Sequence, residues 1–320
     1  MFIKTKKGGQ SVRYNNKIDR KRYKKFILVS TIPVVSFYVI FMIYPILQTL
    51  YYSLFRWSGF SRDMEFILLR NYNELMTDSM FLQTVWNSFK YVFFGSIIII
   101  VITLLFTYVI TNYKSKKLKD LVQMILFVPN TISPVALALL WGFILNTRWG
   151  LLNGLLGKLG LDFLQRGWLG DQYIFGAALS LLVWIHVGFF IIMYVAAADR
   201  IPPSLYESAQ LDGATTWKQF TKITVPLMKD VIETSMVLWT IFSFKIFGYL
   251  YVFGAGGAGS DAPVAVRNIS VHLFLTAFGK RTPINRLAYA SSMAIVLLIL
   301  VAILVYVIRK LIMSGETIEY

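Results

Sequence analysis

The residue types that carry out most enzymatic and metal chemistry are scarce in this sequence. Its 320 residues include two histidines and no cysteine, so a zinc or iron–sulfur site is not expected. The G-x-x-x-x-G-K-[ST] spacing that holds nucleotide phosphates is absent, and the glycine-rich stretch 254–259 lacks the required lysine. No Ser, His and Asp arrangement is recognisable either. The sequence predicts a protein that is not an enzyme and has no metal or cofactor of its own.

Two ionisable side chains nevertheless lie inside long apolar stretches. Lys245 lies in the apolar run 231–253, and a charge at membrane depth is a functional candidate by default. Its long side chain could equally reach outward to the membrane surface. His186 lies in the run 173–197, where a polar contact between helices explains it better than a ligand does.

The composition indicates that these residues lie in an integral membrane protein. Residues of the AVILMFWYC set make up 57% and charged residues 15%, and the mean hydropathy is +0.61. Soluble domains are about 45–50% apolar and about 25% charged. The net charge of +16 would suggest nucleic acid in a soluble protein. Here the basic residues lie between apolar runs, so they indicate membrane topology and contact with anionic lipids.

Six stretches are long and apolar enough to span a bilayer, which takes about 20 residues. Because an open strand cannot satisfy its backbone groups in lipid, all six are expected to be helices. The first is too long for a cleavable signal peptide and no cleavage site follows it. The expected fold is an all-α integral membrane protein with six transmembrane helices, at about 26–50, 89–112, 121–145, 173–197, 231–253 and 287–308.

The basic residues give this chain an orientation. Residues 4–25 contain ten Lys and Arg against one acid, and the loops on the same side bring the total to 20, against ten on the opposite side. This bias places both termini in the cytoplasm. The predicted organisation is a basic cytoplasmic arm (1–25), a membrane domain (26–310) and a cytoplasmic tail (311–320). The arm is interpreted as solvated and lipid-facing, and an ordered docking element is the alternative.

The cytoplasmic loop 199–228, between spans four and five, is patterned like folded structure. Ser204 and Glu207 form a capping box, which predicts a short helix to about Leu211. Gly213 can then supply a left-handed stop. Thr216 and Gln219 form a second capping box, so the loop is expected to be a helix–turn–helix.

The second helix of this loop should carry an apolar stripe, and Pro226 should open the fifth span. Little in the chain is expected to bury that stripe, so a partner is needed. The partner could be the membrane interface or a groove in another protein. The stripe consists of Trp217, Phe220, Ile223 and Thr224.

The loop resembles the cytoplasmic loop of binding-protein-dependent ABC importer permeases. That pattern reads E-A-A, three residues, G, nine residues, I-x-L-P, and here it reads Glu207-Ser208-Ala209, Gly213 and Ile223-Thr224-Val225-Pro226. Ser208 and Val225 depart from it by small changes in size. The resemblance implies that the loop docks into a cleft of an ATPase subunit. The residues it assigns to this interface or its scaffold are Glu207, Ala209, Asp212, Gly213, Ala214, Phe220, Ile223 and Pro226. Glu207 could act first as a helix cap, and Gly213 could serve to end the helix in a left-handed conformation.

Further segments resemble the sugar-type branch of that family, the group with the maltose and glycerol-phosphate permeases. They are Asn87-Ser88, residues 129–141, residues 149–153 through Trp168-Leu169, residues 244–247 and the glycine-rich 254–259. The last segment departs from the family's G-G-P ending and reads Gly-Ser-Asp-Ala-Pro at 259–263. The resemblance implies an inner-membrane location, a second permease subunit (a homodimer being possible), two ATPase subunits that hold ATP and Mg, an extracytoplasmic solute-binding protein, and a sugar-type solute.

A solute path is expected where the third span is interrupted. Pro129 and Pro134 remove backbone donors, and irregular backbone at membrane depth is tolerated beside a cavity. A kink packed by neighbouring helices is the alternative. Aromatic rings stack on pyranose faces and amides bond hydroxyls, which suits a sugar. The candidates are Asn130, Trp141, Trp184, Trp239, Lys245, Tyr249 and Tyr251, each of which could instead be a packing or interfacial residue.

Two other functions remain as alternatives. A polyol or phosphorylated polyol could be the solute, and Lys245 would then provide the one cation in the path. An autonomous ion-coupled transporter would need carboxylates within the membrane. The acidic residues near spans lie at cytoplasmic ends, which disfavours that class: Asp120, Asp199, Asp230 and Glu233.

Overall fold

The computed structural model describes residues 16–113, 115–254, 262–279 and 286–312. Most of the predicted basic arm, the glycine-rich stretch from residue 255 and the tail from residue 313 lie outside the described residues. The chain divides into two compact units, Met1–Tyr51 and Tyr52–Tyr320. Each unit is described by itself below.

The first unit is one long helical run. It comprises α1 (Asn16–Tyr38), the π-helix η1 (Val39–Ile43) and α2 (Tyr44–Tyr52), whose last residue belongs to the second unit. The stretch Arg22–Tyr52 is long enough to cross a membrane, with a window of mean hydropathy 2.4. Because the helix begins at Asn16, the predicted boundary between arm and membrane domain at residue 25 lies within a helix.

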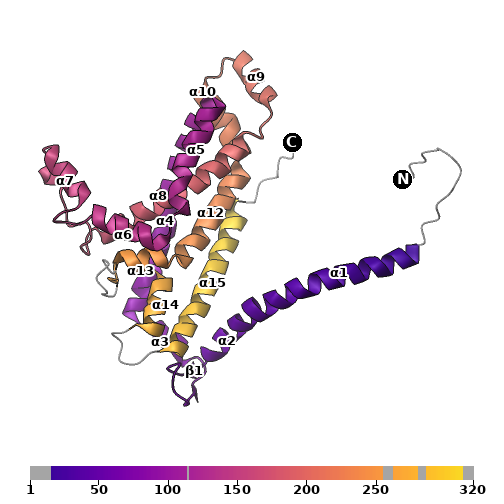
Figure 1. Cartoon of the computed structure of the whole chain (residues 1–320), viewed down its shortest axis with the longest axis vertical. Coiled ribbons are helices and arrows are strands. Elements are labelled where there is room, and N and C mark those ends of the chain that lie inside the picture. Colours follow the sequence, from indigo (N-terminus) through magenta and orange to yellow (C-terminus); the bar gives the residue numbers. More distant parts are fainter. Residues whose placement is uncertain (1–15, 114, 255–261, 280–285, 313–320) are drawn as a thin grey trace. The chain divides into compact units, whose positions relative to one another are not determined.

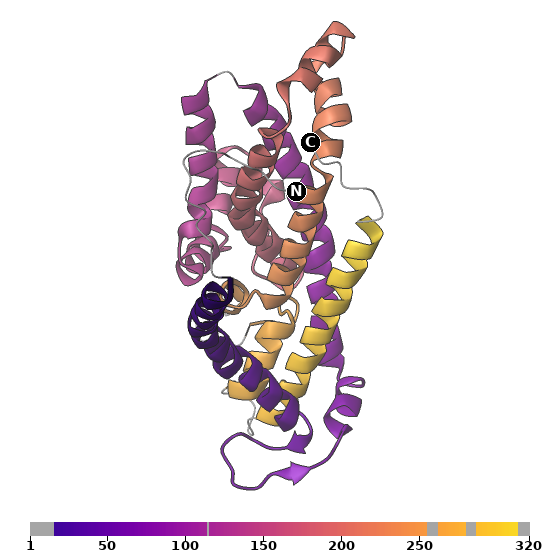
Figure 2. The ribbon, with the colours of Figure 1, turned by 90° about the vertical axis from the view of Figure 1, so that its right-hand side faces the viewer.

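The core of the second unit is formed by long helices that pack side by side. They are α4 (Ser79–Asn112), α8 (Ile174–Ala198) and α15 (Leu287–Ile312). α8 is the central helix, since two thirds of its most apolar window is buried and it packs on α4 and on α5. α15 packs against α12 and α14 (Figure 2). These helices confirm that the fold is built from apolar helices.

Two of the expected spans are broken into pairs of helices. α5 (Lys116–Thr131) and α6 (Pro134–Ile144) are bent by 98°, and α12 (Lys229–Lys245) and α13 (Gly248–Gly254) by 47°. The first break has a clear cause, because Ser133 precedes proline and takes an extended ψ of 132°. The described residues therefore contain four helices able to span a membrane by length and composition, or up to six if each bent pair is one span.

Short elements connect the long helices. Strands β1 (Phe55–Arg56) and β2 (Glu65–Phe66) form an antiparallel hairpin, which the all-α prediction did not include. The remaining elements are α3 (Arg70–Leu75), α7 (Leu151–Lys158), η2 (Asp162–Leu164), α9 (Pro203–Leu211), α10 (Thr216–Gln219), η3 (Phe220–Thr224), α11 (Val225–Leu227) and α14 (Ile269–Phe278). Within the second unit, α9 and α10 lie at one end, and β1 and α3 at the other (Figure 1).

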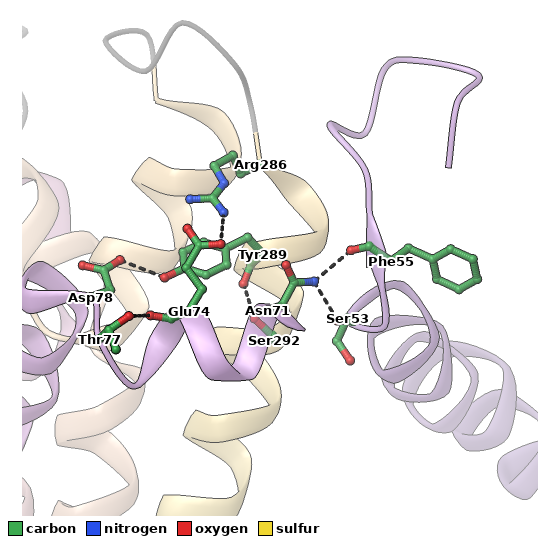
Figure 3. A network of polar contacts seen from close by, with 9 residues as sticks. All are labelled: Ser53, Phe55, Asn71, Glu74, Thr77, Asp78, Arg286, Tyr289 and Ser292. Atoms are coloured by element: carbon green, nitrogen blue, oxygen red, sulfur yellow. Dashed lines mark hydrogen bonds and ion pairs between the residues drawn. The ribbon is translucent and has the colours of Figure 1, made fainter. Parts of the chain in front are cut away.

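A polar network fixes the end of the second unit that contains β1 and α3 (Figure 3). Asn71 donates to the carbonyl oxygens of Ser53 and Phe55, at 2.8 Å each, and so holds the hairpin on α3. Arg286 pairs with Glu74 at 2.7 Å, and the hydroxyl of Tyr289 donates to Asp78 at 2.8 Å. These bonds attach the start of α15 to α3 and to the start of α4.

Candidate functional site

The loop between α8 and α12 folds as the predicted helix–turn–helix. α9 ends at Leu211 and Gly213 has a φ of +77°, a left-handed conformation. The amide of Gly213 donates to the carbonyl of Gln210 at 3.0 Å, and that of Ala214 to Ala209 at 2.9 Å. These two bonds form a Schellman motif, which closes the helix and sets the direction of the following chain. The predicted role of Gly213 as a backbone stop is confirmed.

Neither predicted capping box forms, because both helices begin one or two residues earlier than expected, and Glu207 is therefore not at a capping position. The N-cap of α9 is Pro202, and Ser204 lies within the helix, where it makes no side-chain cap. Pro203 takes the first helical position, which suits a residue that lacks an N–H. The cap of α10 is Thr215, not Thr216, and its Oγ1 accepts from the amide of Lys218 at 3.3 Å.

A π-helix follows α10 and precedes a proline. η3 ends at Thr224, and Pro226 comes two residues later. η1 in the first unit ends at Ile43, and Pro45 follows at the same spacing. In an α-helix the proline ring clashes with the carbonyl four residues earlier. The wider π-turn relieves that clash, and such turns occur often at functional sites.

The structure exposes one part of the predicted interface and buries another. Glu207, Asp212, Gly213 and Pro226 are exposed, and Ala209, Ala214 and Ile223 are half-buried. Phe220 is 5% exposed, so it cannot contact a docked partner in this conformation. The prediction that the apolar stripe lacks a partner in this chain is wrong, because the ring of Tyr108 on α4 packs on Phe220 at 5.2 Å.

The apolar surface that the loop exposes consists of Trp217 on α10, which is 49% exposed, and two leucines on α9. The side chain of Leu211 is 90% exposed and that of Leu205 is 38% exposed. Neither leucine was singled out from the sequence, because the stripe in the second helix gave a stronger apolar pattern.

A cavity of about 580 Å³ lies between α9, η3 and the ends of α4 and α8. Its walls include Glu207 and Asp199, and it has no lysine or arginine among its lining residues. The hydroxyl groups of Tyr206 and Thr224 hydrogen-bond at 2.9 Å and connect α9 to η3 beside it. The loop therefore rests on the helix ends through a few contacts and is not packed against them along its length.

The two helix breaks meet in the core of the second unit. α6 packs against α13, and a β-carbon on Gly248 would lie 3.3 Å from the Cβ of Pro134. Three of the predicted path residues flank these breaks: Asn130, Lys245 and Tyr249. Lys245 is exposed and ends α12, a position that favours a cation because of the helix dipole.

The remaining candidate path residues belong to an aromatic cluster on α6, α8, α12 and α13. Trp141 and Trp184 stack with ring centroids 5.0 Å apart. The ring of His186 lies 5.5 Å from that of Trp239 and 6.1 Å from that of Tyr249. Nδ1 of His186 lies 2.8 Å from the carbonyl oxygen of Leu182 on the same helix, so this polar contact is not the predicted one between helices.

Not every predicted path residue is placed to meet a solute. Trp239 is 1% exposed, and its Nε1 donates to the carbonyl of Tyr91 at 3.2 Å, so it is a core residue here. Tyr251 packs on Phe247 at 5.1 Å. In contrast, Nε1 of Trp141 is buried and has no hydrogen-bond partner within the described residues. Trp141 thus has an unused donor beside the breaks, which is enclosed in this conformation and becomes available to a polar solute only if the helices around the breaks rearrange.

One of the sequence motifs proves to be structural. Asn153 and Trp168, the polar and aromatic members of the segment 149–169, contact each other directly. Nε1 of Trp168 donates to Oδ1 of Asn153 at 2.8 Å, and Nδ2 of Asn153 donates to the carbonyl of Arg166 at 3.0 Å. The spacing of this motif therefore reflects closure of the loop around α7.

The break after α12 depends on Asn268, a residue that the sequence did not single out. Its Nδ2 donates to the carbonyls of Ile246 at 2.7 Å and Ser243 at 3.1 Å, and its Oδ1 accepts from the amide of Val271. One fully buried side chain thus satisfies the end of α12 and caps the start of α14. No local pattern announces this, because the two helix ends are far apart in sequence.

Replacing Asn268 with alanine should destabilise the protein by about 2–4 kcal/mol, because a helix cap is lost and buried carbonyls are left unsatisfied. The measurement is thermal unfolding of the purified protein in detergent. Asn112→Ala is the matched control, because Asn112 is exposed and its side chain donates to one backbone carbonyl, that of Tyr108. Equal melting temperatures for both variants would contradict the role of Asn268.

Comparison with known proteins gives consistent results. Residues 103–315 match the model of a family described as "Binding-protein-dependent transport system inner membrane component". The probable ABC transporter permease protein YurN of Bacillus subtilis (strain 168) is 34% identical over 282 residues, 87% of this chain and 93% of that protein. The diacetylchitobiose uptake system permease protein NgcF of Streptomyces coelicolor is 28% identical over 97% of this chain and 88% of its own length.

The fold is also similar to a solved structure. A chain in the crystal structure of a bacterial alginate ABC transporter, in complex with alginate pentasaccharide-bound periplasmic protein, matches with a TM-score of 0.76. The identity is 23%, and the match covers 95% of this chain and 100% of that chain. At this identity the likeness shows the arrangement of helices.

Proposed function

This chain belongs to the family of inner membrane components of binding-protein-dependent transport systems, and we propose that it is the permease subunit of an ATP-driven importer for a sugar or oligosaccharide. The observation that carries the proposal is the loop 199–228, which lies within the family match and has an exposed α9 closed by Gly213. The sugar class is supported by relatives whose names refer to diacetylchitobiose, trehalose/maltose and arabinooligosaccharides.

The proposed mechanism gives α9 and the two helix breaks different roles. α9 presents Glu207, Leu205 and Leu211 to a groove on a separate ATPase subunit, which binds ATP and Mg. An amphipathic helix in a groove is a common mode of protein recognition. When the ATPase subunits close, α9 moves with them and the helices around the two breaks rearrange, so that the path opens alternately to each side of the membrane.

The path itself is proposed to pass the meeting point of the two breaks. Broken helices at membrane depth leave backbone carbonyls and helix ends available to a solute. Trp141 offers an indole N–H there, Lys245 an ammonium group, and Asn130 an amide. Ring faces and hydroxyl-binding groups in one place suit a sugar. The positive-inside bias supports a cytoplasmic location of the loop and of both termini.

Purification of this chain in mild detergent, with mass spectrometry of its partners, tests the proposal. We expect an ATPase and a second, similar permease to co-purify, and a co-purifying solute-binding protein can then be screened with sugars. ATP-driven uptake of the identified sugar by the purified complex in vesicles is the functional measurement. Recovery of this chain alone, with solute movement that needs no ATP, would contradict the importer and favour an autonomous transporter.

Replacing Lys245 with methionine should weaken solute recognition. A charged hydrogen bond to a solute hydroxyl contributes about 1.5–3 kcal/mol, so the KM for uptake should rise about tenfold or more while ATP hydrolysis without solute stays unchanged. Lys158→Met is a matched control, because Lys158 is also exposed in the last turn of a helix, α7. Unchanged uptake kinetics in the Lys245 variant would place that side chain at the membrane surface.

A further inference from the structure

α4 contacts the coupling loop, here the segment α9 to α11, through one side chain that makes both ring and polar contacts. The ring of Tyr108 lies 5.0 Å from that of Trp217 and 5.2 Å from that of Phe220, both edge-on. Its hydroxyl lies 3.2 Å from Oγ1 of Thr216. Trp217 and Phe220 stack on each other at 6.0 Å. The three rings form a closed aromatic cluster, a geometry that adds attraction beyond the buried area.

The surroundings of this cluster make it a discrete point of contact. The cavity of about 580 Å³ separates much of α9 from the ends of α4 and α8. Leu104 of α4 packs against the same hydrophobic cluster as Tyr206 and Ile223, a contact without directional bonds. Within the described residues, the ring contacts and side-chain hydrogen bonds between α4 and the coupling loop all involve Tyr108.

α4 is built to carry a displacement at Tyr108 along its length. It has 34 residues, no proline and one glycine, Gly95. Helices bend sharply at prolines, π-turns and inserted groups, and α4 is an uninterrupted α-helix. Tyr108 and Tyr91 are about 25 Å apart along its axis at 1.5 Å per residue. Motion of the loop end should therefore appear at the other position as rigid-body motion.

The far part of α4 is held tightly to the helix that ends at the second break. A β-carbon on Gly95 would overlap the indole of Trp239, whose Nε1 donates to the carbonyl of Tyr91. Trp239 in turn contacts His186 in the aromatic cluster. α4 thus joins the coupling loop at one end to the aromatic cluster beside the proposed path at the other.

We propose that Tyr108 is a positioning residue for transport: its ring clamps the coupling loop to α4, so that loop and helix move as one body during the ATP cycle. This inference rests on the proposed function. It assigns the loop's apolar stripe a role inside the chain, and it leaves the exposed face of α9 for the ATPase. The burial of Phe220 follows directly, because its ring is one of the two loop rings that Tyr108 contacts.

Transport by the whole importer, reconstituted in vesicles, tests the clamp through the number of ATP molecules hydrolysed per solute transported. Tyr108→Leu should raise this ratio about tenfold, equivalent to about 1.4 kcal/mol of lost coupling, because α9 still engages the ATPase while α4 no longer follows. Tyr108→Phe keeps the rings and should restore most of the coupling. Tyr113→Leu is the matched control, because Tyr113 is exposed at the end of the same helix.

A double variant separates the clamp from a general loss of packing. Tyr108→Leu and Trp217→Leu act on one contact, so their combined effect on the ratio should be no larger than either alone. Additive effects would overturn the proposal, as would Tyr108→Leu transporting with the wild-type ratio. If the wild-type chain recruits no ATPase at all, the proposed function fails, and this outcome is distinct because it is seen before any variant is made.

A distance measurement reads the clamp directly. The chain has no cysteine, so spin labels on Lys218→Cys in α10 and Met80→Cys at the start of α4 are the only labels that this chain carries. In the assembled importer this distance should stay constant between the nucleotide-free and ATP-bound states, and should change with ATP once Tyr108→Leu is added. A wild-type distance that changes with ATP would show that loop and helix move separately.

Discussion

Replacing Gly213 with valine is expected to abolish ATP-driven uptake while the protein still reaches the membrane in normal amount. The φ of +77° at this position costs an ordinary L-residue about 1–2 kcal/mol, and a β-branched residue more. The Schellman bonds that end α9 would be lost together with the direction of the chain into α10. α9 would then no longer be a rigid body that transmits force. Uptake and membrane content, measured on the same vesicles, check this.

The chain provides a close control for Gly213. Gly160 also has a positive φ, +70°, and like Gly213 it has open space where a side chain would project, but it lies between α7 and η2. Gly160→Val introduces comparable strain away from the coupling loop, so it should leave most of the uptake. Gly213→Asn should restore activity in part, because asparagine tolerates the left-handed region. Equal losses at both glycines would show that strain alone, and not the loop, is responsible.

The second large effect is expected at the crossing of α5 and α8. A β-carbon on Gly188 would overlap the carbonyl group of Leu126, so even alanine must push the two backbones apart. Small residues at helix crossings allow this close approach in membranes. We expect Gly188→Ala to lower stability by about 1–3 kcal/mol, the usual cost of overpacking, and to reduce the amount of assembled protein. Thermal unfolding in detergent measures the first effect.

Gly176→Ala separates this effect from the general influence of a helical glycine. Gly176 lies on the same helix, α8, and has nothing within 4 Å of a built β-carbon. Alanine is the better helix former, so this variant should be unchanged or slightly more stable. A destabilisation of the same size in both variants would mean that the α5–α8 crossing is not the cause.

The coupling loop shows what a sequence pattern can predict. Gly213 was identified correctly because a left-handed stop after a short helix is a local requirement, settled by neighbouring residues. The segment around Asn153 and Trp168 was recognised through its family resemblance, and the hydrogen bond that explains it closes over fifteen residues. The interruption near Pro134 followed from a covalent property of proline, although the angle of 98° between α5 and α6 did not.

Contacts between distant segments were not predictable in this way. Phe220 looked like part of a docking surface because its partner, Tyr108, lies on α4 and carries no pattern of its own. Trp239 was a plausible solute contact by residue type, yet Gly95 opens a space for it in the core. The break after α12 contains no proline, and its cause, Asn268, lies 22 residues beyond Ile246.

That separation matters for biogenesis. The end of α12 leaves the ribosome before the amide that satisfies its carbonyls has emerged from it. At about 5–20 residues per second, the interval between Ile246 and Asn268 is about one to four seconds. During this time the nascent α12–α13 segment must keep polar backbone in contact with water or the insertion machinery. The bent conformation therefore belongs to a late stage of membrane insertion, set when α14 arrives and supplies the amide of Asn268.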